Sequence, residues 1–282
     1  MITVLEVIEK TSGFLAEKGV PEPRLDAEHL IADALSLKRL DLYLQFNRPL
    51  PEEELEAIRA RVRRRARREP LQHILGTADF FGLRLACDGR ALIPRPETEE
   101  LVSRVVERAA LPPGRILDLG TGGGAIAIAL AKAFPEAEAV ATDFSERALD
   151  LARENARVQE VDMRIRFINT CWFDGVEGRF ELVVSNPPYL DAGETSAAEP
   201  EVRDFEPPGS LTAEGAGVSA LEHILRTAPG YLNPGGGLAL ETGTGHHARL
   251  SAVAEESGYA EWRGETDHAG LDRYFFARVP PA

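Results

Sequence analysis

The chain has 282 residues, of which 44% are hydrophobic and 28% are charged, as in an ordinary soluble globular protein. Its net charge of −14 is opposite in sign to that of a non-specific nucleic-acid binder, so we expect no direct nucleic-acid substrate. Two cysteines without a metal-binding spacing, no apolar run of membrane-spanning length and no signal-peptide pattern predict a cytoplasmic protein that does not enter a membrane.

The first 74 residues show helical periodicity and few strand patterns. Apolar residues between Val4 and Leu15 predict one helix, and those between Leu25 and Leu35 predict a second. A short third helix is expected from Leu40 to Phe46, and Pro51 opens a fourth with acidic residues in its first turn. We predict a helical N-terminal domain at 1–74 that recognises the substrate.

The period changes over residues 79–93, where apolar and other residues alternate. Phe81, Leu83 and Leu85 form one alternating run, Asp88-Gly89 is a turn signal, and Ala91 resumes the apolar pattern. The sequence predicts a β-hairpin that links two domains and occupies residues 75–94.

Strands and helices alternate over residues 95–282, the predicted catalytic domain. This order is typical of a doubly wound α/β sheet with a Rossmann-like fold. The last two apolar runs have no helical stretch between them, so we expect the last strand to be antiparallel. The predicted strands centre on Ile116–Asp118, Ala139–Ala141, Ile165–Phe167, Leu182–Val184, Leu238–Leu240, Ala260–Arg263 and Tyr274–Ala277. Residues 191–216, rich in Pro, Glu, Gly and Ala, are expected to form a long loop over the site.

A glycine-rich loop from Gly120 to Gly124 follows the first predicted strand and precedes a helix that starts near Ala125. Such a loop lets a ligand approach the main chain and the free N–H groups of the helix. The pattern alone fits a ligand-free turn, a dinucleotide or S-adenosylmethionine (SAM). Asp118 favours SAM, because a carboxylate would repel a pyrophosphate but could pair with an ammonium group.

Two further residues are candidates for the cofactor site. Asp143 ends the second predicted strand about 20 residues beyond the glycine turn, where an acid commonly binds ribose hydroxyls. Its alternative role is to cap the helix over 145–158, for which Ser145 is the better candidate. Trp172 follows the third strand, and it is either a core residue or a stacking face for adenine.

The stretch Ser185-Asn186-Pro187-Pro188-Tyr189 ends the fourth strand, since proline offers no N–H to a ladder. The prolines stiffen a pocket that presents the Asn186 side-chain oxygen and the Pro187 carbonyl as acceptors, with the Tyr189 ring as a wall. Two acceptors aimed at one point suit a planar NH₂ group. Accepting both of its N–H bonds can turn the nitrogen lone pair towards an electrophile.

Several stretches together resemble the release factor glutamine methyltransferase family, over nearly the whole chain. They are LIPRPETE from Leu92, DLGTG from Asp118, Trp172-Phe173, SNPPY from Ser185, FEP from Phe205 and LETG from Leu240. The resemblance implies SAM-dependent N5-methylation of the glutamine in the Gly-Gly-Gln motif of class 1 peptide chain release factors, with S-adenosylhomocysteine as product. It implies cofactor contacts by Asp118, Gly120, Thr121, Gly122, Gly123, Gly124, Asp143, Trp172 and Asn186. It implies substrate contacts by Asn186, Pro187, Pro188 and Tyr189, of which Asn186, Pro187 and Tyr189 are the predicted catalytic residues.

Three positions depart from the family pattern. Cys171 stands where an acidic residue is common, Ser219 where Asp is common, and His246 where Gln is common. An arginine run from Arg59 to Arg68 fits a solvated helix face better than a grip on an acidic partner or RNA. The six histidines show no metal-site spacing, and we predict no metal.

Alternative functions remain open. A ribosomal protein glutamine methyltransferase would share the same pocket. A nucleic-acid adenine methyltransferase would also have to flip its base, which the acidic charge disfavours. A SAM-binding module without turnover is disfavoured by the intact pocket at Asn186. We expect a monomer.

Overall fold

The computed structural model describes residues 2–109, 111–212 and 217–282. They divide into two compact units: 1–77 with 199–205, and 78–198 with 206–282. Within these described ranges, no helix combines the length and apolar character needed to cross a membrane.

The first unit is a helical bundle, as the apolar periodicity predicted. A capping box between Thr3 and Glu6 starts its first helix, and Pro51 precedes the helix with three glutamates in its first turn. The predicted third helix is a 3₁₀ helix, and the apolar faces enclose a core that includes Ile8, Leu30 and Leu42. The helices are α1 (Val4–Glu17), α2 (Pro23–Ala34), η1 (Arg39–Leu44), α3 (Glu52–Arg65), α4 (Leu71–Leu75) and α9 (Pro200–Phe205).

The arginine run is only in part the solvated face that we expected. Arg65 has a side chain 6% exposed and forms ion pairs with Asp26 (2.6 Å) and Glu201 (2.7 Å). Arg68 pairs with Glu201 (2.6 Å) and with Glu199 (2.8 Å), both in the later segment of this unit. The prediction is therefore wrong for these two arginines, because acids far along the chain come back to bury them.

The second unit opens with the hairpin, whose turn lies seven residues earlier than predicted. Its strands are β1 (Thr77–Phe80) and β2 (Leu83–Ala86), joined at Phe81-Gly82. Both turn residues have positive φ, +51° and +72°, as a tight two-residue hairpin turn requires. Asp88 instead closes a local turn, its Oδ1 accepting from the Arg90 N–H (3.0 Å).

A seven-stranded sheet in the order β5-β4-β3-β6-β7-β9-β8 forms the centre of this unit. The pairs among the first five strands are parallel, whereas β9 runs antiparallel to β7 and β8, as predicted for the last strand. The strands are β3 (Arg115–Leu119), β4 (Glu138–Asp143), β5 (Ile165–Asn169), β6 (Phe180–Ser185), β7 (Leu232–Glu241), β8 (Glu261–Thr266) and β9 (Asp272–Arg278).

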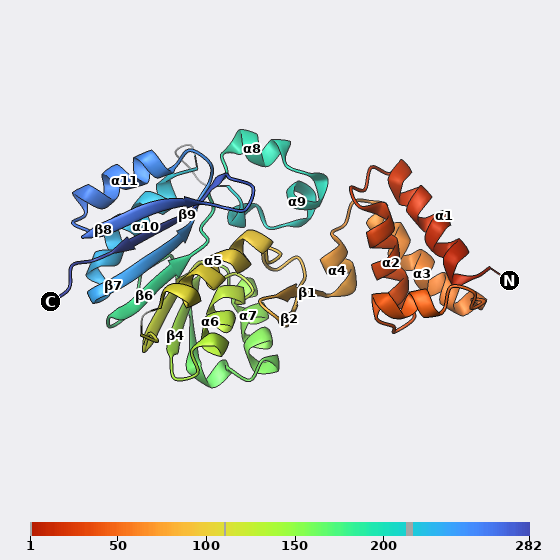
Figure 1. Ribbon diagram of the computed structural model, residues 1–282, viewed down its shortest axis with the longest axis horizontal. Coiled ribbons are helices and arrows are strands. Elements are labelled where there is room, and N and C mark those ends of the chain that lie inside the picture. The colour runs from red at the N-terminus through yellow and green to blue at the C-terminus, as the bar shows by residue number, and fades with distance from the viewer. Residues whose placement is uncertain (1, 110, 213–216) are drawn as a thin grey trace. The chain divides into compact units, whose positions relative to one another are not determined.

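Helices cover both faces of the sheet. Their apolar faces pack against the sheet in two cores. One core includes Leu101 and Leu130, and the other, on the opposite face, includes Leu221 and Leu250. In Figure 1, α5, α6 and α7 lie on one side of the strands and α10 and α11 on the other. These helices are α5 (Pro96–Arg108), α6 (Ala125–Ala133), α7 (Glu146–Val158), α10 (Ser219–Thr227) and α11 (His247–Glu256).

The segment expected as one long loop contains short helices where it is described. They are α8 (Ala192–Ala197), α9 and η3 (Pro208–Ser210). Two 3₁₀ turns lie outside this segment, in the second unit: η2 (Asp162–Arg164) and η4 (Ala228–Gly230). Positions 213–216 of the predicted loop lie outside the described residues. Leu119 of β3 pairs with Thr142 and Ser185, so the carboxyl ends of β3, β4 and β6 meet at one edge, where α/β sheets bind ligands.

Candidate active site

The glycine loop lies at this edge, between β3 and α6. Gly120, Gly122 and Gly124 have φ of +68°, +55° and +86°, a backbone region that side chains disfavour. A Cβ at Gly124 would also lie 3.0 Å from the Cβ of Ala152 on α7. The sequence therefore needs glycine here both for the turn and for the close approach of two helices.

Asp118 lies beneath the loop and is fully buried. Its Oδ2 accepts hydrogen bonds from the Thr121 hydroxyl (2.6 Å) and the Ala127 N–H (3.1 Å), whereas its Oδ1 has no partner. Burial raises the pKa of Asp118 to about 7, although the two donors act in the opposite direction. A ligand with a positive group near Oδ1 would stabilise the ionised form, so the carboxylate fits the ammonium predicted from sequence.

Asp143 lies at the end of β4 and faces the same cavity. Its Oδ2 accepts from the Gly122 N–H (2.9 Å) and its Oδ1 from the Ser145 N–H (2.8 Å). Ser145 is the N-cap of α7, accepting from the Ala148 N–H, as predicted in preference to Asp143. Burial raises the pKa of Asp143, and the two backbone donors oppose that effect.

Trp172 is half-buried, packs against the core that contains Leu221, and also lines the cavity. Its backbone has φ of +51°, and its carbonyl accepts from the Thr142 hydroxyl (3.1 Å). A Cβ built on Gly120 would lie 3.5 Å from the Trp172 ring, an ordinary van der Waals distance, so the glycine loop lies directly beside the indole. The ring therefore contacts both the core and the cavity, and the stacking role stays a prediction.

The predicted substrate loop begins where β6 ends. Asn186 and Pro188 line the cavity, Pro187 is buried, and Tyr189 is half-buried outside the cavity lining. Asn186 Nδ2 donates to the Thr98 hydroxyl (2.9 Å). The Tyr189 hydroxyl donates to Glu241 Oε1 (2.9 Å), and burial raises the tyrosine pKa.

Asp143, Trp172, Asn186 and Pro188 share one cavity of about 480 Å³, within the roughly 300–1,000 Å³ of small-molecule sites. Six of the predicted site residues do not line this cavity and lie next to residues that do. They are Asp118, Gly123, Gly124, Thr121, Pro187 and Tyr189. Its other lining residues include Arg90, Leu92, Phe144 and His223, to which the sequence analysis gave no role. Leu92 begins the LIPRPETE stretch that resembles the family, and Phe144 and His223 lie far from it along the chain, where no local pattern marks them.

Two of the three departures from the family pattern, Cys171 and Ser219, line this cavity. Cys171 is exposed and not in a disulfide. The third, His246, accepts from the Gly243 N–H through Nδ1 (3.2 Å) and so holds the turn after β7. The departures therefore alter the cavity wall and a supporting turn, and they leave the loop at Asn186 unchanged.

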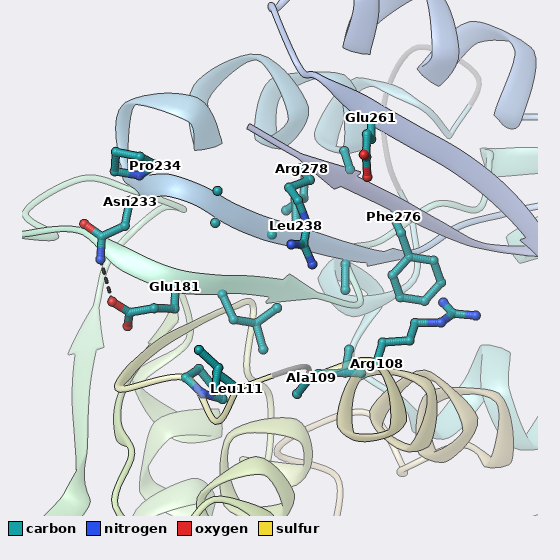
Figure 2. Close-up of a pocket in the computed structure, with 18 of the residues that line it drawn as sticks. Arg108, Ala109, Leu111, Glu181, Asn233, Pro234, Leu238, Glu261, Phe276 and Arg278 are labelled. Atoms are coloured by element: carbon teal, nitrogen blue, oxygen red, sulfur yellow. Dashed lines mark hydrogen bonds between the residues drawn. The ribbon is translucent and has the colours of Figure 1, made fainter. Parts of the chain in front are cut away.

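A larger cavity of about 800 Å³ lies towards the opposite edge of the sheet. Its walls include Leu182 and Gly237. In Figure 2 the Arg108 guanidinium lies against the Phe276 ring, 4.2 Å from the ring centroid, and Asn233 donates to Glu181 (2.6 Å). It contains none of the predicted site residues and is at the wrong end of the parallel strands. The smaller cavity is therefore the candidate active site.

Metal chemistry has no evident centre in the described part of the chain. Across those residues, no group of three or more His, Cys, Asp or Glu side chains could hold a metal ion.

Comparisons with known proteins identify the family of this chain. Models of the PrmC N-terminal domain and the methyltransferase small domain match residues 6–76 and 97–201. A release factor glutamine methyltransferase of Geobacter sulfurreducens is 40% identical over 98% of this chain and 97% of its own length. One of Chlorobaculum tepidum is 41% identical over 96% and 95%.

A solved structure resembles the fold of this chain. The T. thermophilus 16S rRNA N2 G1207 methyltransferase, in complex with AdoMet and guanosine, has a TM-score of 0.53 and 17% identity. The match covers 72% of this chain and 49% of that one. At this identity the likeness supports a methyltransferase fold and no more.

Proposed function

The chain belongs to the release factor glutamine methyltransferase family, and we propose that it methylates N5 of the glutamine in the Gly-Gly-Gln motif of class 1 release factors. SAM-dependent methylation of a release factor glutamine follows from the family. The observation that carries the finer proposal is the opening of the Asn186 loop into the cavity that Asp143 and the glycine loop line. Translation termination takes place in the cytoplasm, and we place the enzyme there.

We propose that Asp118, Asp143 and Trp172 hold SAM together with the backbone from Gly120 to Gly124. SAM supplies an electrophilic methyl group when it is bound. Asp143 and Trp172 line the cavity, where the carboxylate fits two ribose hydroxyls and the ring fits the adenine. Asp118 is buried behind the cavity wall, and its unpartnered Oδ1 fits an ammonium that reaches beneath the glycine loop. Thr121 acts through Asp118, to which its hydroxyl donates.

We propose that Asn186 Oδ1 and the Pro187 carbonyl accept the two N–H bonds of the substrate amide. Among the described residues, none donates a hydrogen bond to Asn186 Oδ1, so this acceptor is available. An amide nitrogen is a weak nucleophile because its lone pair is delocalised. Holding both hydrogens in preset positions orients the nitrogen and stabilises the positive charge that develops on it. Pro188 and Tyr189 fix the loop.

Methylation with labelled SAM tests this function directly. We expect label in a class 1 release factor, mapped by mass spectrometry to the Gly-Gly-Gln glutamine, and none when that glutamine is replaced by alanine. Ribosomes and DNA serve as competing substrates in parallel reactions. Label in a ribosomal protein or in adenine, with an unlabelled release factor, would assign the pocket to one of the alternative functions.

A further inference from the structure

The hydroxyl of Thr98, in the first turn of α5, lies between a buried carboxylate and the Asn186 side chain. Its Oγ1 is 2.6 Å from Glu241 Oε2 and 2.9 Å from Asn186 Nδ2. Thr98 is 5% exposed and Glu241 is 1% exposed. Water is therefore excluded from a chain of hydrogen bonds that joins α5, β7 and the loop after β6.

The direction of these hydrogen bonds follows from counting hydrogens. An ionised carboxylate can only accept, and a threonine hydroxyl has one hydrogen to donate. The 2.6 Å distance is typical of a hydroxyl that donates to a carboxylate. The Thr98 hydrogen therefore goes to Glu241, and only a lone pair remains for Asn186.

A lone pair requires a donor opposite it. The Asn186 amide has a donor end and an acceptor end of nearly the same shape, so packing alone selects poorly between its two orientations. With Thr98 accepting, Nδ2 must face Thr98 and Oδ1 must face the other way. The carboxylate thus decides, through one hydroxyl, which end of the amide the substrate meets.

The second oxygen of the same carboxylate holds the other end of the loop. The Tyr189 hydroxyl donates to Glu241 Oε1 (2.9 Å) and accepts from Arg273 Nη1 (3.2 Å). Burial, the largest cause, and the charge of Glu97 raise the pKa of Glu241 overall, and the donors from Thr98 and Tyr189 and the charge of Arg273 oppose that rise. The hydrogen-bond order needs the ionised form, which these two donors and the guanidinium stabilise.

We propose that Thr98 and Glu241 are positioning residues that hold the Asn186 amide with Oδ1 turned towards the substrate nitrogen. The inference rests on the proposed function, since it assigns Oδ1 the role of accepting from the substrate amide. Without the Thr98 hydroxyl the amide can rotate, and in the rotated form its NH₂ meets the NH₂ of the substrate. That form offers no acceptor and binds the substrate unproductively.

Thr98→Val tests the role, because valine keeps the branched shape and removes the hydroxyl. Thr98→Ser is the matched control, since serine keeps the hydroxyl and loses a methyl group. In single-turnover methylation of a release factor with SAM saturating, we expect Val to be roughly tenfold to a hundredfold slower. We expect Ser to stay within about threefold of wild type, and the SAM dissociation constant to stay within about twofold in both. Equal rates for Val and Ser would overturn the proposal.

A double-mutant cycle with Asn186→Ala separates positioning from general damage. If Thr98 acts through the Asn186 amide, Thr98→Val should cost little further rate once that amide is absent. A Thr98→Val loss of the same size in both backgrounds would contradict the mechanism. Glu241→Gln gives a second route, because a glutamine amide can donate to Thr98 and reverse the hydrogen order. It should slow methylation in the native background and add little to Thr98→Val.

A measurement without turnover keeps this test independent of the substrate. The chain contains five asparagines, so ¹⁵N-asparagine labelling gives few side-chain amide signals. Asn186→Ala identifies the signal of residue 186, and its hydrogens should exchange slowly in wild type and Thr98→Ser and faster in Thr98→Val. Unchanged exchange in Thr98→Val would refute the positioning role, even if release factors proved not to be the substrate. Thermal unfolding checks that each variant is folded, and Thr98→Ala replaces Thr98→Val if valine does not fit.

Discussion

Replacing the buried carboxyl of Asp118 by an amide should stabilise the free protein at high pH. Asp118 is fully buried, its Oδ1 has no partner, and burial raises its pKa from the ordinary 3.8 to about 7. Between about pH 4 and pH 7 the folded state therefore holds a proton that the unfolded state has released. The free energy of unfolding falls as pH rises through this range and levels off above it.

The size of the effect follows from the same difference in pKa. At 1.36 kcal/mol for each pH unit, the change from 3.8 to about 7 corresponds to roughly 4 kcal/mol. Asp118→Asn removes the ionisation and keeps an acceptor for Thr121 and Ala127. The quantity to compare is the free energy of unfolding of the variant minus that of wild type. We expect this difference to be roughly 2–4 kcal/mol more favourable to the variant at pH 8 than at pH 4, since local relaxation lowers the upper value.

Urea unfolding at a series of pH values measures this gain. Asp162→Asn is the matched control, the same exchange at an exposed position, and its difference from wild type should stay nearly constant. A constant difference for Asp118→Asn between pH 4 and pH 8 would refute the reasoning. In the same variant, calorimetric titration should show SAM affinity reduced by about tenfold or more, because a charged partner for its ammonium is lost.

Substitutions at three further positions test other parts of the molecule. Asp143→Ala should weaken SAM binding by about tenfold or more in calorimetric titration, and unchanged affinity would reduce Asp143 to a support for the glycine turn. Asn186→Ala should slow single-turnover methylation by roughly 10²–10³. Asn186→Asp should bind SAM at least as well as wild type and also methylate slowly, and wild-type rates in both would remove Asn186 from the mechanism. Arg65→Met should destabilise the helical unit by roughly 3–5 kcal/mol in urea unfolding, because Asp26 loses its partner and Glu201 keeps only Arg68, whereas the exposed Arg63→Met should have nearly no effect.

Features encoded within a few residues could be predicted from the sequence. The glycine loop and the strand ends at Asp143 and Ser185 follow from local patterns, because glycine, proline and apolar runs restrict the backbone directly. The antiparallel last strand follows from the missing helix before it. The hairpin turn was misplaced, since Phe81 adopts a positive φ that its side chain does not favour and Asp88-Gly89 is a stronger local signal.

Contacts between distant residues could not be predicted in this way. Thr98 and Asn186 are 88 positions apart, and Thr98 and Glu241 are 143 apart. Each lies in a stretch that resembles the family, but only the folded sheet brings the three together. The burial of Arg65 is of the same kind, because Glu201 lies far beyond the arginine run.

The carboxyl groups around the cavity hold neighbouring groups in position by accepting hydrogen bonds. They do not serve to transfer protons. Asp118 and Asp143 accept hydrogen bonds from the glycine loop and its flanking residues, and Glu241 accepts from Thr98 and Tyr189. An amide nitrogen keeps both hydrogens until it has gained its methyl group, after which the acidified proton leaves readily. A reaction of this kind needs fixed acceptors for N–H bonds more than a strong base. A loop stiffened by two prolines, with its asparagine amide oriented from behind by a buried carboxylate, meets that need.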